Sequence, residues 1–191
     1  MIYQYQGYTS LSKTNITNCV SDFETAFYYN YVGSTTNALF CNFEKLEASS
    51  NGITNFDTCD GKVERCNYIN NLQRTDSYGI VIDWSNKVQI LDSVFQGNNH
   101  NNKGKLFSTV SGQIYIIKCN NDRYTTNSVG GIIDNSNMKT QSFANNLKFI
   151  RLSPCEGEII LVHEKGSKLF NKYRYFLFGK CFVSFLEISN Q

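Results

Sequence analysis

The sequence predicts an all-β protein built as a parallel β-solenoid, in which each turn of the chain pairs with the next. Two columns of similar residues recur along the 191 residues at intervals of 22 to 27 residues. Asparagine and glycine turns, with a single proline in the chain, join short runs rich in β-branched and aromatic residues. No helical period of 3.6 residues accompanies the repeat. A period of about 25 residues with these features is typical of one solenoid turn.

The first column is mostly cysteine, and it consists of Cys19, Cys41, Cys66, Ser93, Cys119 and Gln141. An apolar residue stands three positions before each member (Ile16, Ala38, Val63, Ile90, Ile116 and Met138), and Phe43, Tyr68, Phe95 and Phe143 stand two positions after four of them. A small, weakly polar side chain at this place suits a narrow core. Zinc needs four ligands that converge on one point, which a linear stack does not provide. We therefore expect buried thiols, no metal site and no cofactor.

The second column precedes an apolar run in each unit, and it consists of Ala26, Gly52, Gly79, Gly104, Gly130 and Gly157. Two of these runs, "GIVIDWSN" (79–86) and "GGIIDNSN" (130–137), end in the same pattern of Ile, Asp, any residue, Ser and Asn. We expect them to be the same corner strand, two turns apart. With a weaker seventh unit, the pattern predicts one domain over 1–191 with about seven turns. Residues 1–14 would form a partial first turn, and 167–191 an aromatic last turn without a polar cap.

The segments "ITNC" (16–19) and "VFQGNN" (94–99), with the paired asparagines and the glycine that follow, carry a family resemblance. They resemble the polymorphic outer-membrane-protein and pectin-lyase-like adhesin group. The resemblance implies a right-handed parallel β-helix in a surface or scaffolding protein without an active site. It also implies the cell surface, whereas the first residues of the chain as given contain no secretory signal pattern and so indicate the cell interior.

Enzymes also use the pectin-lyase-like fold, so the carboxylates need examination. Asp83 and Asp134 would share a column at about 10 Å, since Thr109 lies between them. Inverting glycosidases need about 6.5–9.5 Å between their carboxylates. The two histidines, His100 and His163, fall on different sides of the repeat. We expect no catalytic residues, and a degenerate carbohydrate-active enzyme is the second alternative for the function.

The composition limits the classes of partner that the chain is expected to bind. The formal net charge is +2, which gives no support for binding to nucleic acid. No run of about 18 apolar residues is present, so we expect no direct insertion into a membrane.

The apolar runs indicate where partners would bind. Val81, Phe107 and Ile132 align, and we expect them to form an outward apolar ladder because Asp83, Thr109 and Asp134 share their strand parity. Ile80 and Ile82 would then face the core. The chain's own loop at 123–129 or a partner would cover the ladder, and we favour a partner. The aromatic end, with Tyr175, Phe176 and Phe178, is the second expected partner site.

Together these features predict a non-catalytic module of adhesin-like type. It would present stacked β-helix faces to protein or glycan partners, which cover a flank or the open ends of the solenoid. The alternative is an intracellular architectural component of a large assembly, such as a cytoskeletal or axonemal lattice.

Overall fold

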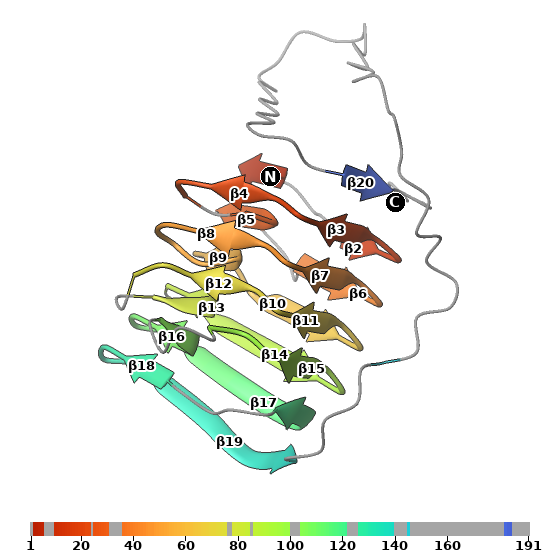
Figure 1. Cartoon of the computed structure of the whole chain (residues 1–191). Coiled ribbons are helices and arrows are strands. Elements are labelled where there is room, and N and C mark those ends of the chain that lie inside the picture. Colours follow the sequence, from red (N-terminus) through yellow and green to blue (C-terminus); the bar gives the residue numbers. More distant parts are fainter. Residues whose placement is uncertain are drawn as a thin grey trace, which may run out of the picture.

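The computed structural model describes residues 2–5, 10–23, 25–30, 36–75, 78–84, 86–99, 104–121, 126–139, 145 and 182–184. These residues form short strands joined by turns and bends, and they contain no helix (Figure 1). All but one of the strand pairs among the described residues are parallel, and in these parallel pairs the strands of one turn lie beside the corresponding strands of the next. The predicted all-β parallel solenoid is confirmed.

Each of the first three turns contains four short strands, and the fourth contains three. The strands of the first turn are β1 (Ile2–Tyr5), β2 (Ser10–Ser12), β3 (Asn15–Thr17) and β4 (Val20–Ser21). The second has β5 (Phe27–Asn30), β6 (Thr36–Leu39), β7 (Asn42–Glu44) and β8 (Glu47–Ala48), and the third has β9 (Thr54–Asp57), β10 (Gly61–Glu64), β11 (Asn67–Ile69) and β12 (Leu72–Gln73). The fourth has β13 (Gly79–Asp83), β14 (Lys87–Leu91) and β15 (Val94–Gln96).

The chain continues beyond these four turns with β16 (Lys105–Thr109) and β18 (Thr126–Ser128), and with two longer strands, β17 (Gln113–Asn121) and β19 (Ile132–Lys139). The described residues therefore contain about four full turns, whereas the repeat predicts about seven over the whole chain. Of the expected units beyond residue 139, only Asn145 and β20 (Phe182–Ser184) are described.

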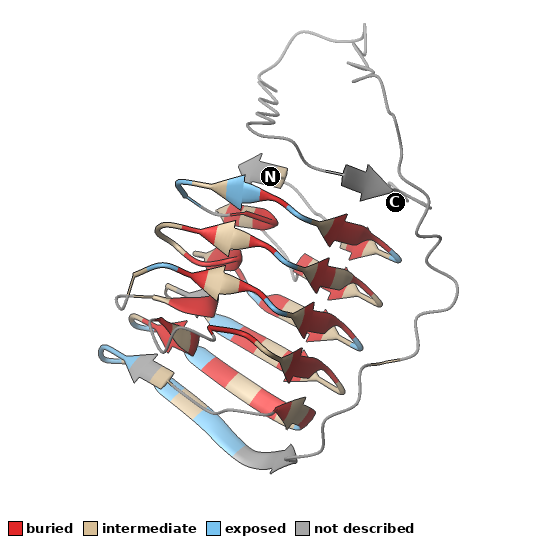
Figure 2. Ribbon diagram, in the orientation of Figure 1, coloured by how far each residue is buried: buried red, intermediate tan, exposed pale blue. Residues whose placement is uncertain are grey.

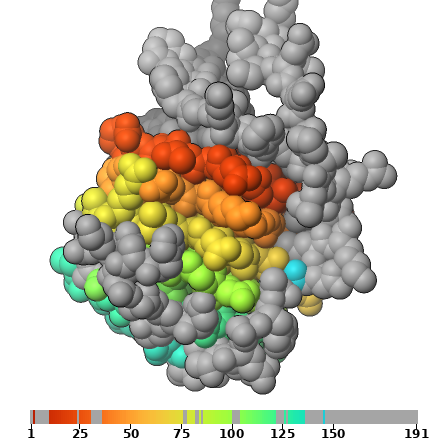
Figure 3. Space-filling model, viewed as in Figure 1, coloured from red at the N-terminus to blue at the C-terminus, as the bar shows by residue number. Residues whose placement is uncertain are grey.

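The equivalent strands stack into three sheets that run along the solenoid. One has the order β1-β5-β9-β13-β16-β18, and a short one has the order β12-β8-β4. The largest contains β2-β6-β10-β14 and β3-β7-β11-β15, which β17 joins because this one strand continues through the corner at Lys118 and pairs with both β14 and β15. Figure 3 shows the stacked turns as successive bands on one side of the molecule.

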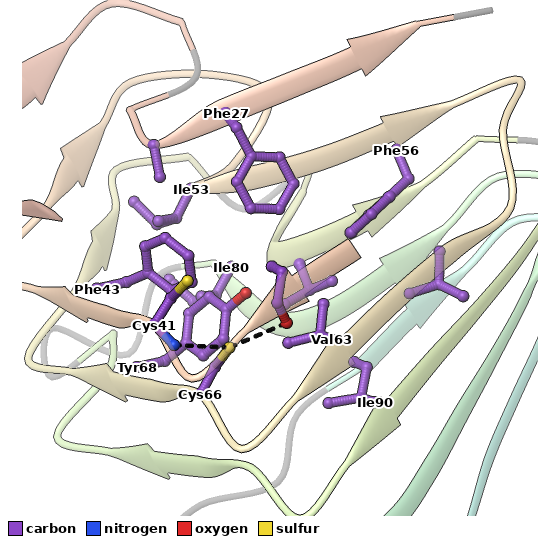
Figure 4. Close-up of a cluster of buried hydrophobic side chains, with 14 of the residues drawn as sticks. Phe27, Cys41, Phe43, Ile53, Phe56, Val63, Cys66, Tyr68, Ile80 and Ile90 are labelled. Carbon is purple, nitrogen blue, oxygen red and sulfur yellow. Dashed lines mark hydrogen bonds between the residues drawn. The ribbon is translucent and has the colours of Figure 1, made fainter. Parts of the chain in front are cut away.

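The core fills the space that the three sheets enclose, and the buried residues line the inside of every turn (Figure 2). Aromatic rings stack along it from turn to turn. The ring centroids of Phe43 and Tyr68 lie 4.8 Å apart, those of Tyr68 and Phe95 4.7 Å, and those of Phe95 and Phe107 4.8 Å. Such pairs add about 0.5–1.5 kcal/mol each to the free energy gained by burial. Figure 4 shows Phe43, Tyr68 and the thiols packed together in this core.

The first predicted column is confirmed from the second turn onward within the described residues, but the second is confirmed only for Gly52 and Gly79. Gly79 pairs with Lys105 and not with Gly104, and Ala26 lies opposite Ile53 and not Gly52. Ala38, Val63, Ile90 and Ile116 pair in one line, and Phe43, Tyr68, Phe95 and Asn121 in another. The prediction for the first member of the cysteine column was wrong: Thr14, five residues before Cys19, occupies this position. Asn15 pairs with Asn42, so that Thr14 lies opposite Cys41 while Cys19 precedes the pair of Val20 and Glu47. Because the position requires only a small side chain, threonine occupies it as well as cysteine does.

The two similar segments of the sequence are not equivalent in the structure. "GIVID" forms β13 in the first sheet, whereas residues 132–139 form β19 and pair with β17 in the large sheet. The partner of Phe107 in the next turn is Thr126 of β18. Thr126 follows Asn121 by five residues, whereas Phe107 follows Phe95 by 12. The chain thus reaches the first sheet early in this turn, and the later residues are displaced from their expected columns.

Two corners of each turn are formed by residues in the left-handed region. The first corner contains Lys13, Phe40, Arg65, Asp92 and Lys118, and the second contains Asn18, Lys45, Asn70 and Gly97. Their φ angles lie between 46° and 66°. At a third position, asparagine amides connect the turns: Asn71 Oδ1 accepts from the Leu46 N–H at 2.9 Å, and Asn98 Oδ1 accepts from the Asn71 N–H at 3.0 Å. These bonds satisfy main-chain donors that the bend leaves without a strand partner.

Candidate functional site

The expected apolar ladder does not lie on the surface. Val81 and Phe107 pair with each other as expected, but both are 0% exposed and belong to the core cluster. Phe107 packs edge-on against Phe95 inside the solenoid. Ile132 is 57% exposed, but it pairs with Gln113 and not with Phe107. The outward assignment is therefore wrong for Val81 and Phe107, and the three residues form no common surface.

The reason lies at the corner before this sheet. Ile80 and Leu106, which precede Val81 and Phe107, are also 0% exposed. The strict alternation of inward and outward side chains holds only along a straight strand. Here the chain bends, and the consecutive residues Ile80 and Val81 both face the core. Figure 4 shows Ile80 in this core together with Ile53 of the neighbouring turn. No outward cover is needed to bury them, and residues 126–128 of the expected covering loop form β18 instead.

The carboxylate pair is separated as well. Asp83 lies in β13, where it pairs with Thr109, whereas the exposed Asp134 lies in β19 and pairs with Tyr115. The two aspartates thus belong to different sheets and share no column. His100, His163, Tyr175, Phe176 and Phe178 lie outside the described residues.

The five described cysteines are internal. Cys19, Cys41, Cys59, Cys66 and Cys119 are all buried in the core. The Cys66 thiol donates to the Ala38 carbonyl at 3.3 Å, and the Cys119 thiol donates to the Ile90 carbonyl at 3.4 Å, each across one turn. Loss of solvation on burial raises the pKa of Cys119 to about 12, and it also raises the pKa of Cys66. These thiols are protonated at neutral pH, so they pack as small core residues and do not act as nucleophiles.

No group of three or more His, Cys, Asp or Glu side chains in the described parts of the chain is arranged to hold a metal ion. Within the same residues, no helix is long and apolar enough to cross a bilayer.

The most regular surface is the outer side of β2, β6, β10, β14 and β17, which we call the ladder face. It presents two columns of half-buried side chains. One consists of Ser10, Asn37, Lys62, Gln89 and Tyr115, and the other of Ser12, Leu39, Glu64, Leu91 and Ile117. Members of a column repeat at the inter-strand spacing of about 4.8 Å.

An ion pair, a cation–π contact and a hydrogen bond hold side chains of the ladder face in place. Lys62 Nζ lies 2.6 Å from Glu64 Oε2, and Lys87 Nζ lies 5.0 Å from the centre of the Tyr115 ring. The Tyr115 hydroxyl donates to Gln113 Oε1 at 2.7 Å. The first column is rich in amides and hydroxyls, and the second contains Leu39, Leu91 and Ile117, so together they can hydrogen-bond and pack against an extended ligand. Sequence reasoning missed this face, although the alternation in "KVQIL" (87–91) and "QIYII" (113–117) signals it.

Comparison of the chain with protein-family models, with curated proteins and with solved structures finds no match.

Proposed function

We propose that this chain is a non-catalytic binding and structural module of adhesin-like type, which presents its stacked faces to protein or glycan partners. The ladder face carries the proposal. A rigid core holds its two columns at a fixed spacing, so a ligand with a repeating extended backbone meets the same set of groups at every turn. Little conformational entropy is lost when such a preorganised surface binds. The resemblance to the pectin-lyase-like adhesin group supports the same function.

A glycan array and a peptide array probed with the full chain test this proposal. Gln89→Ala/Tyr115→Ala, which removes an amide and an aromatic ring from one column, is expected to weaken binding about tenfold or more. The matched control is Glu47→Ala/Arg74→Ala, because this exposed ion pair bridges two turns on the short sheet. Equal binding by both variants, or no binding of the wild-type chain to any glycan or peptide, would show that the ladder face is not the binding surface.

The alternative, an architectural component of a large intracellular assembly, is supported by the ends of the solenoid. The exposed large hydrophobic residues among those described are Val20 and Phe23 on the first turn, and Val129 and Ile132 near the last. Exposed apolar side chains at both ends favour burial against neighbouring molecules. The mass of the particle that holds the chain in its native source distinguishes the two functions. A particle far heavier than the 21.8 kDa chain favours the architectural one.

A further inference from the structure

The outer side of the first sheet carries a carboxylate that neighbouring hydroxyl groups hold in place. Asp57 follows the buried Phe56 in β9 and is half-buried, and Asn30 of β5 is its partner in the sheet (Figure 1). The Tyr28 hydroxyl donates to Asp57 Oδ2 at 2.6 Å, and the Thr58 hydroxyl donates to Asp57 Oδ1 at 2.9 Å. Asn30 Nδ2 donates to the Tyr28 oxygen at 3.1 Å and so fixes the direction of the Tyr28 O–H. The Asp57 carboxylate is therefore held rigidly, and each of its oxygens can accept a further hydrogen bond.

An aromatic pair lies beside this carboxylate, one turn further along the solenoid. The Trp84 N–H donates at 3.0 Å to the carbonyl of Phe56, the residue before Asp57, so Trp84 is the neighbour of Asp57 across the sheet. The ring of Trp84 meets the ring of Tyr78, with centroids 5.4 Å apart and an interplanar angle of 47°. Both side chains are half-buried and neither belongs to the core cluster, so the rings lie on the outer side of β13. We call Asp57, Tyr78 and Trp84 the acceptor site.

The acceptor site attracts positive charge. No lysine or arginine among the described residues forms an ion pair with Asp57. The hydroxyls of Tyr28 and Thr58 that contact the carboxylate are neutral and already donate to it. What the site offers to a ligand is therefore the negative charge of the carboxylate, its remaining acceptor capacity and the electron-rich faces of two rings.

These properties distinguish between classes of ligand. A neutral sugar that covered Asp57 would remove the carboxylate from water without supplying an opposite charge, which is costly. Rings with centroids 5.4 Å apart are in contact with each other, so the pair forms one surface and not a cage around a quaternary ammonium group. A guanidinium group has five N–H donors and no acceptor, stacks flat on an aromatic ring and bonds a carboxylate through two parallel N–H groups.

We propose that the acceptor site binds an arginine side chain of a partner protein, with the guanidinium group stacked on Trp84 and bonded to the Asp57 carboxylate. Arginine and tryptophan are among the residues that contribute most to the affinity of protein interfaces. The inference rests on the proposed binding function, but it assigns a second surface to a protein partner and does not involve the ladder face.

The test uses the fluorescence of Trp84, which is the only tryptophan of the chain and therefore reports on the site directly. The full chain is titrated with a five-residue peptide that has arginine between two pairs of glycines and blocked termini. The emission of Trp84 is expected to change with a dissociation constant of about 1 mM. The matched peptide contains citrulline, which has nearly the same shape but no charge, and it should bind at least about tenfold more weakly. Equal binding of both peptides, or no change in emission up to about 20 mM of the arginine peptide, would overturn the proposal.

Two carboxylate variants separate the acceptor site from general electrostatic attraction. Asp57→Asn keeps the shape of the side chain, removes its charge and should weaken binding of the arginine peptide about tenfold or more. The matched control is Asp60→Asn, because Asp60 is exposed and lies three residues after Asp57 but outside the site. Equal weakening by the two variants would overturn the proposal. If Asp57→Asn does not fold, Trp84→Leu carries the test: titration calorimetry should show about tenfold weaker binding, and unchanged binding would be equally decisive against the proposal.

Two further titrations show where a different ligand or surface is responsible. Gln89→Ala/Tyr115→Ala should bind the arginine peptide as tightly as the wild-type chain does. Weaker binding by this variant would mean that the peptide binds to the ladder face, and the proposal would be wrong even if the proposed function held. A change in Trp84 emission with a neutral oligosaccharide such as cellohexaose, equal in the wild-type chain and in Asp57→Asn and absent with the arginine peptide, would assign the site to sugars and overturn the proposal.

Discussion

At the scale of the single residue, the two buried tyrosines Tyr29 and Tyr68 differ in one hydrogen bond. Both are 0% exposed. The Tyr68 hydroxyl shares a hydrogen bond with Thr54 Oγ1 at 3.3 Å, whereas the Tyr29 hydroxyl has no hydrogen-bond partner among the described residues. We expect Tyr29→Phe to raise the free energy of unfolding by about 1 kcal/mol and Tyr68→Phe to lower it by a similar amount. Urea unfolding of the two variants measures this, and a loss in Tyr29→Phe would contradict it.

The left-handed corner residues lead to a second residue-scale prediction. Lys118 is exposed and has a φ of 54°, a conformation that costs a residue with a Cβ about 1–2 kcal/mol. Glycine avoids this cost but loses more backbone entropy on folding. We expect Lys118→Gly to raise the free energy of unfolding by about 0.5 kcal/mol and Lys118→Val to lower it by about 1 kcal/mol. Lys105→Gly, at the first position of the paired strand β16, is the control and should be destabilising. A destabilised Lys118→Gly would contradict the assignment.

At the scale of the element, the inward orientation of β16 can be tested by truncation. Phe107 is fully buried against Phe95, so Phe107→Ala leaves a cavity and should lower the free energy of unfolding by about 3–5 kcal/mol. Ile132→Ala, at a 57% exposed side chain, should change it by less than about 0.5 kcal/mol. Thermal unfolding followed by circular dichroism compares the two. A small effect of Phe107→Ala would restore the outward orientation that strand parity predicted.

The same elements show what the sequence could and could not predict. Ala38, Val63 and Ile90 keep one size and polarity because they fill the same part of the core, so their column is visible in the sequence. The register of the first turn could not be predicted from the sequence. Thr14 meets the same need for a small side chain as Cys41 but is a different residue type. The bend that turns both Ile80 and Val81 inward depends on three-dimensional packing, and period-two reasoning does not include it.

The pairing of β20 with β3 could not be predicted from the sequence either. The aromatic C-terminal segment indicated an adhesive end, but nothing in its sequence assigns β20 to the first turn of the solenoid. A short strand pairs through its main chain, so its partner leaves no signature in the side chains. The ladder face, by contrast, follows from alternation in β14 and β17 once those strands are placed.

At the scale of the whole molecule, the turns are joined by strand pairing, by stacked rings and by buried polar groups that reach from one turn to the next. Cys66 contributes to this through three bonds. Its thiol donates to the Ala38 carbonyl at 3.3 Å, its Sγ accepts from the Cys41 N–H at 3.4 Å, and its own N–H donates to Ser93 Oγ at 3.1 Å. Side chains that connect every turn to the next make neighbouring turns cooperative. Ionisation of one buried group should therefore affect the unfolding of the whole stack.

This leads to a prediction about alkaline pH. Burial raises the pKa of Cys119 to about 12, whereas a thiol of the unfolded chain titrates near 8.5. Between about pH 9 and pH 12 the unfolded chain has lost this proton and the folded chain keeps it. The free energy of unfolding should therefore fall as the pH rises, by about 1.4 kcal/mol per pH unit for this thiol.

Burial also raises the pKa of Cys66, Tyr29 and Tyr68, which adds to the alkaline loss, so a difference between two chains is needed to isolate Cys119. The measurement is urea unfolding under reducing conditions at about pH 8 and pH 10.5, for the wild-type chain and for Cys119→Ala. The variant should be less stable at pH 8, because it leaves a small cavity, but it should lose less stability between the two pH values. Equal losses would mean that the Cys119 thiol ionises in the folded chain as it does in the unfolded one, and that the core is open to water at the level of β17.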